Sequence, residues 1–127
     1  MSAPIRIALA DDQALVRSGL KALLAGFDSL EVVLEAGDGE ALLAAMAEAP
    51  VDVVLSDIRM PGLDGFGLVQ ALRARGDATP VVLLTTFDDE ALPLRAAAAG
   101  AQGFLLKDAS PEDLVEAITR VAAGETL

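Results

Sequence analysis

The stretch Val51-Asp52-Val53-Val54-Leu55-Ser56-Asp57 decides the fold of this chain. Residues 51–56 predict a strand, and the strand has too little alternation of apolar and polar residues to leave one face in water. We therefore expect it to be buried on both faces, as is typical of a parallel sheet that helices cover on both sides. A turn cluster follows at residues 60–65, Met-Pro-Gly-Leu-Asp-Gly, and then a helix with the apolar residues Leu68, Val69 and Leu72.

The same alternation of a short strand and a longer helix runs through the whole chain. Strands are predicted at residues 5–10, 31–36, 51–56, 80–85 and 103–106, and a helical pattern follows each of them. Five such βα units imply right-handed crossovers, a parallel sheet and helices on both of its faces. No linker or repeat interrupts the pattern, so the sequence predicts one α/β domain over residues 1–127.

Several predicted helices have recognisable starts. Asp38 is expected to cap the second helix, and Ser110 the fifth, with Pro111 at the first helical position. The fourth helix has a pattern over about residues 89–99, but Pro93 would interrupt it if the helix were capped at Asp88. We therefore expect this helix to begin late, near Leu92, with a mobile loop before it.

Composition excludes several classes of function. The 127 residues contain 20 acidic and 9 basic side chains, a net charge of −11, which argues against direct binding to nucleic acid. The absence of Cys and His excludes disulfides, His- or Cys-ligated zinc and His-dependent catalytic triads. No secretory signal or membrane-spanning run is visible, so a cytoplasmic protein without a membrane partner is expected.

Chemically active side chains follow four of the predicted strands. Asp11 and Asp12 follow the first strand, Asp57 the third, Thr85 closes the fourth, and Lys107 follows the fifth. Ligands of open parallel sheets bind beyond the carboxyl ends of the strands, so these groups should meet. Carboxylates without His or Cys suit a hard cation such as Mg²⁺. A lysine and a hydroxyl beside such a metal would suit phosphoryl chemistry.

Each of these residues also has a simpler interpretation. Asp11-Asp12 could be only a helix N-cap, Thr85 only a β-branched strand end, and Lys107 only a solvated surface lysine. Asp57 is harder to explain in this way, because a carboxylate at the end of a buried strand is costly unless it is paired or bound to a metal.

Taken together, these pieces resemble a response regulator receiver domain over the whole chain. The resemblance is carried by Asp11-Asp12, by residues 57–65 (Asp-Ile-Arg-Met-Pro-Gly-Leu-Asp-Gly), by Thr85, and by residues 103–107 (Gly-Phe-Leu-Leu-Lys). It implies a flavodoxin-like (βα)5 three-layer sandwich with a parallel five-stranded sheet in the order 2-1-3-4-5. In that order the first and third strands are neighbours, which would bring the three aspartates together.

The resemblance also implies roles for these residues. Asp57 would accept a phosphoryl group from a phosphohistidine of a sensor histidine kinase. Mg²⁺ would be bound by Asp12, Asp57 and the backbone carbonyl of Arg59, and by Asp11 through water. Lys107 would pair with Asp57 and then with a phosphoryl oxygen, and Thr85 would donate its hydroxyl to another oxygen.

Four residues would report or tune the phosphorylated state in a domain of this kind. Movement of Thr85 toward the phosphoryl group would let Phe104 turn inward and change the face formed by the fourth helix, fifth strand and fifth helix. Phe104 as simple core packing is the alternative. Arg59 and Phe87 would control water access and hence the rate of self-dephosphorylation, although Arg59 could equally be a solvated charge.

Residues 11–20, 84–90 and 105–111 resemble the NarL/FixJ subfamily, whose members usually carry a C-terminal LuxR-type helix-turn-helix domain. The implied partners are a sensor kinase and that output domain, which would regulate transcription, with phosphorylation-linked homodimerisation as a further hypothesis. The DNA-binding domain is not expected within this chain.

The residues also bear on three other functions. A haloacid-dehalogenase-type phosphatase needs an acid two residues after its nucleophile, where this chain has Arg59. An FMN-binding flavodoxin needs a hydroxyl- and glycine-rich loop after the first strand, where Asp11-Asp12 would repel a phosphate. A stand-alone or phosphorylation-independent receiver, which acts only through protein contacts, remains the alternative.

Overall fold

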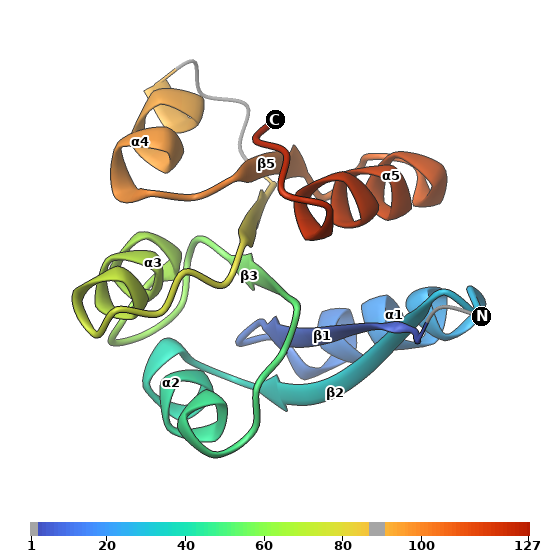
Figure 1. The fold of residues 1–127 in the computed structure, drawn as a ribbon, viewed down its shortest axis with the longest axis horizontal. Coiled ribbons are helices and arrows are strands. Elements are labelled where there is room, and N and C mark those ends of the chain that lie inside the picture. Colours follow the sequence, from blue (N-terminus) through green and yellow to red (C-terminus); the bar gives the residue numbers. More distant parts are fainter. Residues whose placement is uncertain (1–2, 87–90) are drawn as a thin grey trace.

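The computed structural model describes residues 3–86 and 91–127. Within them the chain alternates strand and helix five times (Figure 1), with β1 Ile5–Ala10, α1 Ala14–Ala25, β2 Leu30–Ala36, α2 Gly39–Glu48, β3 Val53–Asp57, α3 Gly65–Ala74, β4 Val81–Thr85, α4 Ala91–Ala99, β5 Gly103–Leu106 and α5 Pro111–Ala122. The five predicted βα units are confirmed.

All strand pairs are parallel and the sheet order is β2-β1-β3-β4-β5, as the family resemblance implies. Helices α2, α3 and α4 cover one face of the sheet, and α1 and α5 cover the other (Figure 1). The result is the expected three-layer, flavodoxin-like sandwich.

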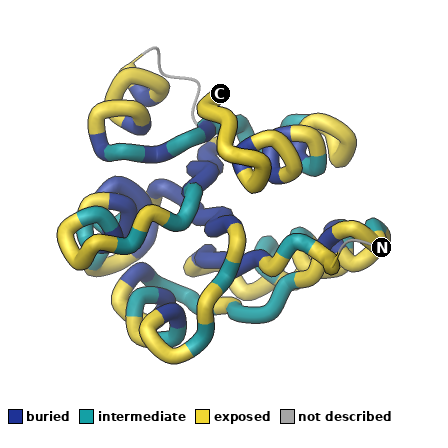
Figure 2. The backbone as a smooth tube through the Cα atoms, in the orientation of Figure 1, coloured by how far each residue is buried: buried dark blue, intermediate teal, exposed yellow. Residues whose placement is uncertain are grey.

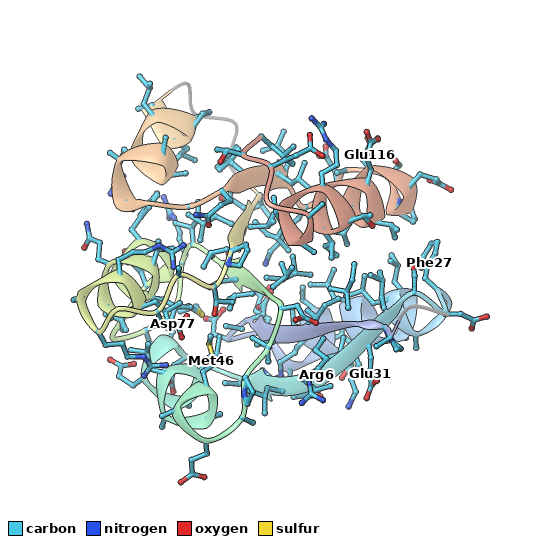
Figure 3. All side chains as sticks on the ribbon, in the orientation of Figure 1. Arg6, Phe27, Glu31, Met46, Asp77 and Glu116 are labelled. Carbon is cyan, nitrogen blue, oxygen red and sulfur yellow. The ribbon has the colours of Figure 1, made fainter. Side chains whose placement is uncertain are left out.

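Two apolar clusters hold the three layers together. Successive residues of a strand point to opposite faces: Ala8 and Val54 pack under α2–α4, whereas Ile7 and Val53 pack under α1 and α5. Every residue of β3 and β4 is buried, and Figure 2 shows the buried part of the chain concentrated in the centre. Figure 3 shows Met46 on the side of α2 that faces α3, whereas Glu116 points from α5 into solvent.

The bounds of the central strand differ from the prediction. It begins at Val53 rather than Val51 and ends on Asp57, which pairs with Leu84 of β4. Asp52 lies outside the strand, and its carboxylate accepts a hydrogen bond from the Arg6 backbone N–H at 2.8 Å. Asp57 is therefore held by the sheet itself and not by the loop after it.

The predicted starts of α2 and α5 agree with the structure. Asp38 accepts a hydrogen bond from the Ala41 N–H at 2.7 Å, and Ser110 accepts one from the Asp113 N–H at 3.1 Å. The described part of α4 runs from Ala91 to Ala99 and contains Pro93. The predicted late start of this helix and the predicted mobility of the segment before it, residues 88–91, fall mostly on residues outside the described part of the chain, so both stay predictions.

In the part of the chain that the structure describes, no helix is long and apolar enough to cross a membrane.

Candidate functional site

The carboxyl end of the sheet gathers the residues that the sequence singled out. Asp11 follows β1, Asp57 ends β3, Thr85 ends β4 and Lys107 follows β5. Because β1 and β3 are neighbours, one carboxylate oxygen from each of Asp11, Asp12 and Asp57 lies within 4.8 Å of the other two. Asp11 is 1% exposed and Asp57 is 8% exposed, whereas Asp12 is open to solvent.

The interpretation of Asp11-Asp12 as a helix N-cap is wrong. The N-cap of α1 is Gln13, which makes no side-chain capping bond. One oxygen of Asp11 instead accepts a hydrogen bond from the Gln13 N–H at 2.9 Å, outside the helix. The acidic pair therefore belongs to the loop at the sheet edge.

Lys107 joins two of the three carboxylates. Its Nζ lies 3.2 Å from Asp57 Oδ2, as predicted, and 2.8 Å from Asp11 Oδ2, a partner that the sequence analysis did not predict. The lysine side chain is only 14% exposed, so it is not a solvated surface residue. One ammonium thus offsets the charge of a crowded group of acids.

The electrostatics of the site favour cation binding. Burial raises the pKa of Asp57, and the nearby Asp11 raises it further, although Lys107 and the Arg59 backbone lower it in part. Burial by itself lowers the pKa of Lys107, but its hydrogen bonds and attraction to Asp11 and Asp57 outweigh burial and raise the pKa overall. Burial, and to a smaller degree the neighbouring Asp11, makes ionised Asp57 costly, and a bound divalent cation would relieve that cost.

A polar pocket of about 290 Å³ opens above these groups. It is lined by Asp12, Gln13, Asp57, Arg59, Thr85, Thr86 and Lys107. The pocket therefore gives Asp57, Lys107 and Thr85 a shared space that a small phosphorylated ligand could enter.

The β3–α3 loop brings Arg59 to this pocket by a tight path. A Cβ on Gly65 would lie only 2.6 Å from the Asp57 backbone oxygen, so only glycine lets α3 begin so close to the end of β3. Gly62 has a φ of 72°, and the carboxylate of Glu40 on α2 accepts a hydrogen bond from the Leu63 N–H at 2.9 Å. Glu40 was missed in the sequence because nothing in the local pattern links α2 to this loop.

Thr85 and Phe104 lie in different environments. Thr85 is 2% exposed and lines the polar pocket. Phe104 is half-buried on β5, packs against the core under α2–α4, and lines a second cavity with residues of α4 and the C-terminal segment. Phe87, the second predicted tuning residue, lies outside the described residues.

The chain is similar in sequence to several known proteins. The model of the response regulator receiver domain family matches residues 7–119. The chain is 41% identical over 97% of its length to the uncharacterized transcriptional regulatory protein YxjL of Bacillus subtilis, and 38% identical over 95% to the nitrate/nitrite response regulator protein NarP of Escherichia coli. It covers 56% of each, so the chain spans about half the length of these curated relatives.

A solved structure resembles the whole chain. The signal receiver domain of the putative response regulator NarL from Mycobacterium tuberculosis superposes with a TM-score of 0.93 at 37% identity, over 98% of this chain and 100% of that one.

Proposed function

The chain belongs to the response regulator receiver domain family, and we propose that it accepts a phosphoryl group on Asp57 from a phosphohistidine of a sensor histidine kinase. Receiver domains are signalling proteins rather than classical enzymes. The observation that carries the proposal is the contact of Asp57 with Lys107 at 3.2 Å inside a three-carboxylate cluster. The chain contains no histidine, so it has no phosphohistidine of its own to donate.

The donor set fits Mg²⁺, which prefers oxygen ligands and retains several waters. Asp12 and Asp57 would bind the ion directly with the backbone carbonyl of Arg59, and Asp11 would bind it through water. This division of roles agrees with the hydrogen bonds of Asp11, whose two oxygens already accept from Gln13 and Lys107. When bound, the ion would offset the repulsion between the carboxylates and an incoming phosphoryl group.

The transfer itself needs little covalent chemistry from the protein. A carboxylate oxygen of Asp57 attacks phosphorus, the phosphorus–nitrogen bond of the donor breaks, and the electron pair leaves with the imidazole, which is protonated. Lys107 then pairs with one phosphoryl oxygen, and the Thr85 hydroxyl donates a hydrogen bond to another. Catalysis of this kind rests on positioning and electrostatics.

The phosphorylated state would be transmitted to α4, β5 and α5. Thr85 ends β4 beside Asp57, and Phe104 lies on the neighbouring strand β5. We propose that Thr85 moves toward the phosphoryl group, that Phe104 turns inward, and that this face then controls an output domain. The names of the relatives include transcriptional regulators, so a LuxR-type DNA-binding domain in the full-length protein and phosphorylation-linked dimerisation belong to the same proposal.

Return to the resting state would occur by hydrolysis of the acyl phosphate at the same site. Arg59 lines the pocket two residues after Asp57 and is placed to influence water access there. A phosphorylation-independent receiver is the second candidate, but the complete set of Asp57, Lys107, Thr85 and the acidic pair favours phosphorylation.

Intact-mass analysis after incubation with acetyl phosphate tests the proposal. Wild-type protein should gain the mass of one phosphoryl group when Mg²⁺ is present and little when EDTA is added. Asp57→Asn should gain none. The matched control is Asp52→Asn, just before the start of the same strand and far from the pocket, which should behave as wild type. An equal mass gain in Asp57→Asn and wild type would reject Asp57 as the acceptor.

A further inference from the structure

Arg17 on α1 makes two bonds that reach into different parts of the fold. Its Nη1 donates to the backbone carbonyl of Asp11 at 2.6 Å, and its Nε donates to Glu35 Oε1 on β2 at 3.2 Å. The other oxygen of Glu35 pairs with Lys21 at 2.8 Å. The Arg17 side chain is only 21% exposed, and its planar guanidinium is suited to holding two acceptors at once.

The carbonyl that Arg17 holds belongs to the peptide that joins Asp11 to Asp12. Peptide groups are planar, so fixing the carbonyl oxygen fixes the whole unit, including the N–H of Asp12. On its other side, the Asp11 N–H donates to Ala36 O of β2 at 3.1 Å. Asp11 is therefore tied to β2 directly through its amide, and its carbonyl is tied to β2 through Arg17 and Glu35.

Asp12 depends on this peptide more than Asp11 does. The carboxylate of Asp11 is fixed by Lys107 and by the Gln13 N–H. Asp12 is exposed, and within the described part of the chain no hydrogen-bond donor holds its carboxylate. The direction of its side chain toward Asp57 is consequently set by its backbone.

We propose that Arg17 is a positioning residue for the metal site: it fixes the Asp11–Asp12 peptide and so aims the Asp12 carboxylate at the cation beside Asp57. The inference rests on the proposed function, because it assumes that Asp12 binds Mg²⁺. Groups that orient metal ligands typically change metal affinity by 10- to 100-fold when they are removed.

The chain offers a matched control for this proposal. Lys21 shares Glu35 with Arg17 and carries the same charge on the same helix, but its bond goes to Glu35 alone. Lys21→Met therefore removes a cation and a tie between α1 and β2, and leaves the Arg17–Asp11 bond intact. Arg17→Lys keeps the charge, but a single ammonium cannot reproduce the two-point hold.

The experiment is an Mg²⁺ titration of the full chain, followed by backbone amide chemical shifts in wild type, Arg17→Met, Arg17→Lys and Lys21→Met. We expect both Arg17 variants to bind Mg²⁺ about tenfold more weakly than wild type, and Lys21→Met to match wild type. In metal-free protein the amide signals of Asp12 and Gln13 should shift in the Arg17 variants and stay in place in Lys21→Met. Urea unfolding of all four proteins shows whether each variant is folded.

The possible outcomes separate the two proposals. Equal Mg²⁺ affinity in wild type and both Arg17 variants would overturn the role of Arg17 and leave the proposed function standing. Full affinity in Arg17→Lys alone would also overturn it, because charge and not geometry would then be responsible. A wild-type protein that binds no Mg²⁺ would overturn the proposed metal site, and the role of Arg17 with it. Were Arg17→Met unfolded, Arg17→Lys would decide.

Discussion

The two ends of the sheet both contain partly buried charged side chains, but the surroundings of these charges differ. At the carboxyl end, three carboxylates lie close together, Lys107 pairs with two of them, and burial raises the pKa of Asp57. At the amino end, the guanidinium of Arg73 donates to four oxygens, namely Asp77 O, Thr79 O, Gly100 O and Gln102 Oε1, each at 2.9–3.0 Å. Figure 3 labels Asp77 beside α3 at this end.

This difference indicates that the carboxyl end serves binding, whereas the contacts of Arg73 at the amino end stabilise the fold. Around Arg73 each of the four oxygens comes from one of two loops that the guanidinium connects, the α3–β4 loop and the α4–β5 loop. Around Asp57 the ammonium of Lys107 does not balance the charge of three carboxylates. The remaining negative charge lowers the stability of the folded protein and favours the binding of a cation. Four predictions test this contrast.

Replacement of Arg73 should have the largest effect. Arg73→Met removes the donor to three backbone carbonyl oxygens and one of the two donors to Gln102 Oε1, and we expect a loss of about 3 kcal/mol in the free energy of unfolding. Urea denaturation measures it. The control is Arg75→Met, an exposed arginine on the same helix end that donates to Leu43 O, which should lose less than about 1 kcal/mol. Similar losses in the two variants would show that Arg73 and its four acceptors contribute no more to stability than an exposed arginine does.

Addition of Mg²⁺ should stabilise the protein through the carboxyl end only. At a concentration ten times the dissociation constant, a ligand that binds only the folded state adds about 1.4 kcal/mol to the free energy of unfolding. Wild type and Arg73→Met should gain equally in urea denaturation with and without Mg²⁺, and Asp57→Asn should gain less. An equal gain in Asp57→Asn would place the cation elsewhere.

In metal-free buffer, Asp57→Asn should be more stable than wild type at neutral pH by about 1 kcal/mol. The folded-state pKa of Asp57 is raised above its unfolded-state value. Between these two pKa values the folded protein binds more protons than the unfolded protein, so the free energy of unfolding falls as pH rises through this range. The advantage of Asp57→Asn should shrink as pH falls below the folded-state pKa. Urea denaturation in EDTA over a pH series measures this, and a variant less stable than wild type at neutral pH contradicts it.

Asp77→Asn should give the smallest effect and the opposite sign. Burial raises the pKa of Asp77, but hydrogen bonds from the Thr79 hydroxyl and N–H and the charges of Arg75 and Arg73 outweigh it and lower the pKa. This stabilisation is present above the unfolded-state pKa and is lost as pH falls through the folded-state pKa. We expect a cost of about 0.5 kcal/mol at neutral pH in the same pH series. Parallel pH profiles for Asp57→Asn and Asp77→Asn would remove the contrast between the two ends.

The five βα units and the gathering of the acids at one edge of the sheet followed from patterns that are local in the sequence, whereas the strand order followed from the family resemblance. A doubly buried strand ending at Asp57, the acids after the first strand and Lys107 after the fifth each stand at a predictable strand end, and parallel strands place all their carboxyl ends on one edge. Pro93 favours a late start of the fourth helix for an equally local reason, because proline is tolerated in the first turn of a helix but not in its interior.

Sequence patterns therefore determined the α/β fold class, and the resemblance indicated the strand order and the residues of the site. Only the tertiary structure decided the partners of those residues. The second bond of Lys107 to Asp11, the hold of Arg17 on the Asp11 carbonyl, and the clamp of Glu40 on the β3–α3 loop each join residues 6 to 96 positions apart. Periodicity reports which face of an element is buried, but which charged groups meet depends on how the loops and helices pack, and that is a property of the whole fold.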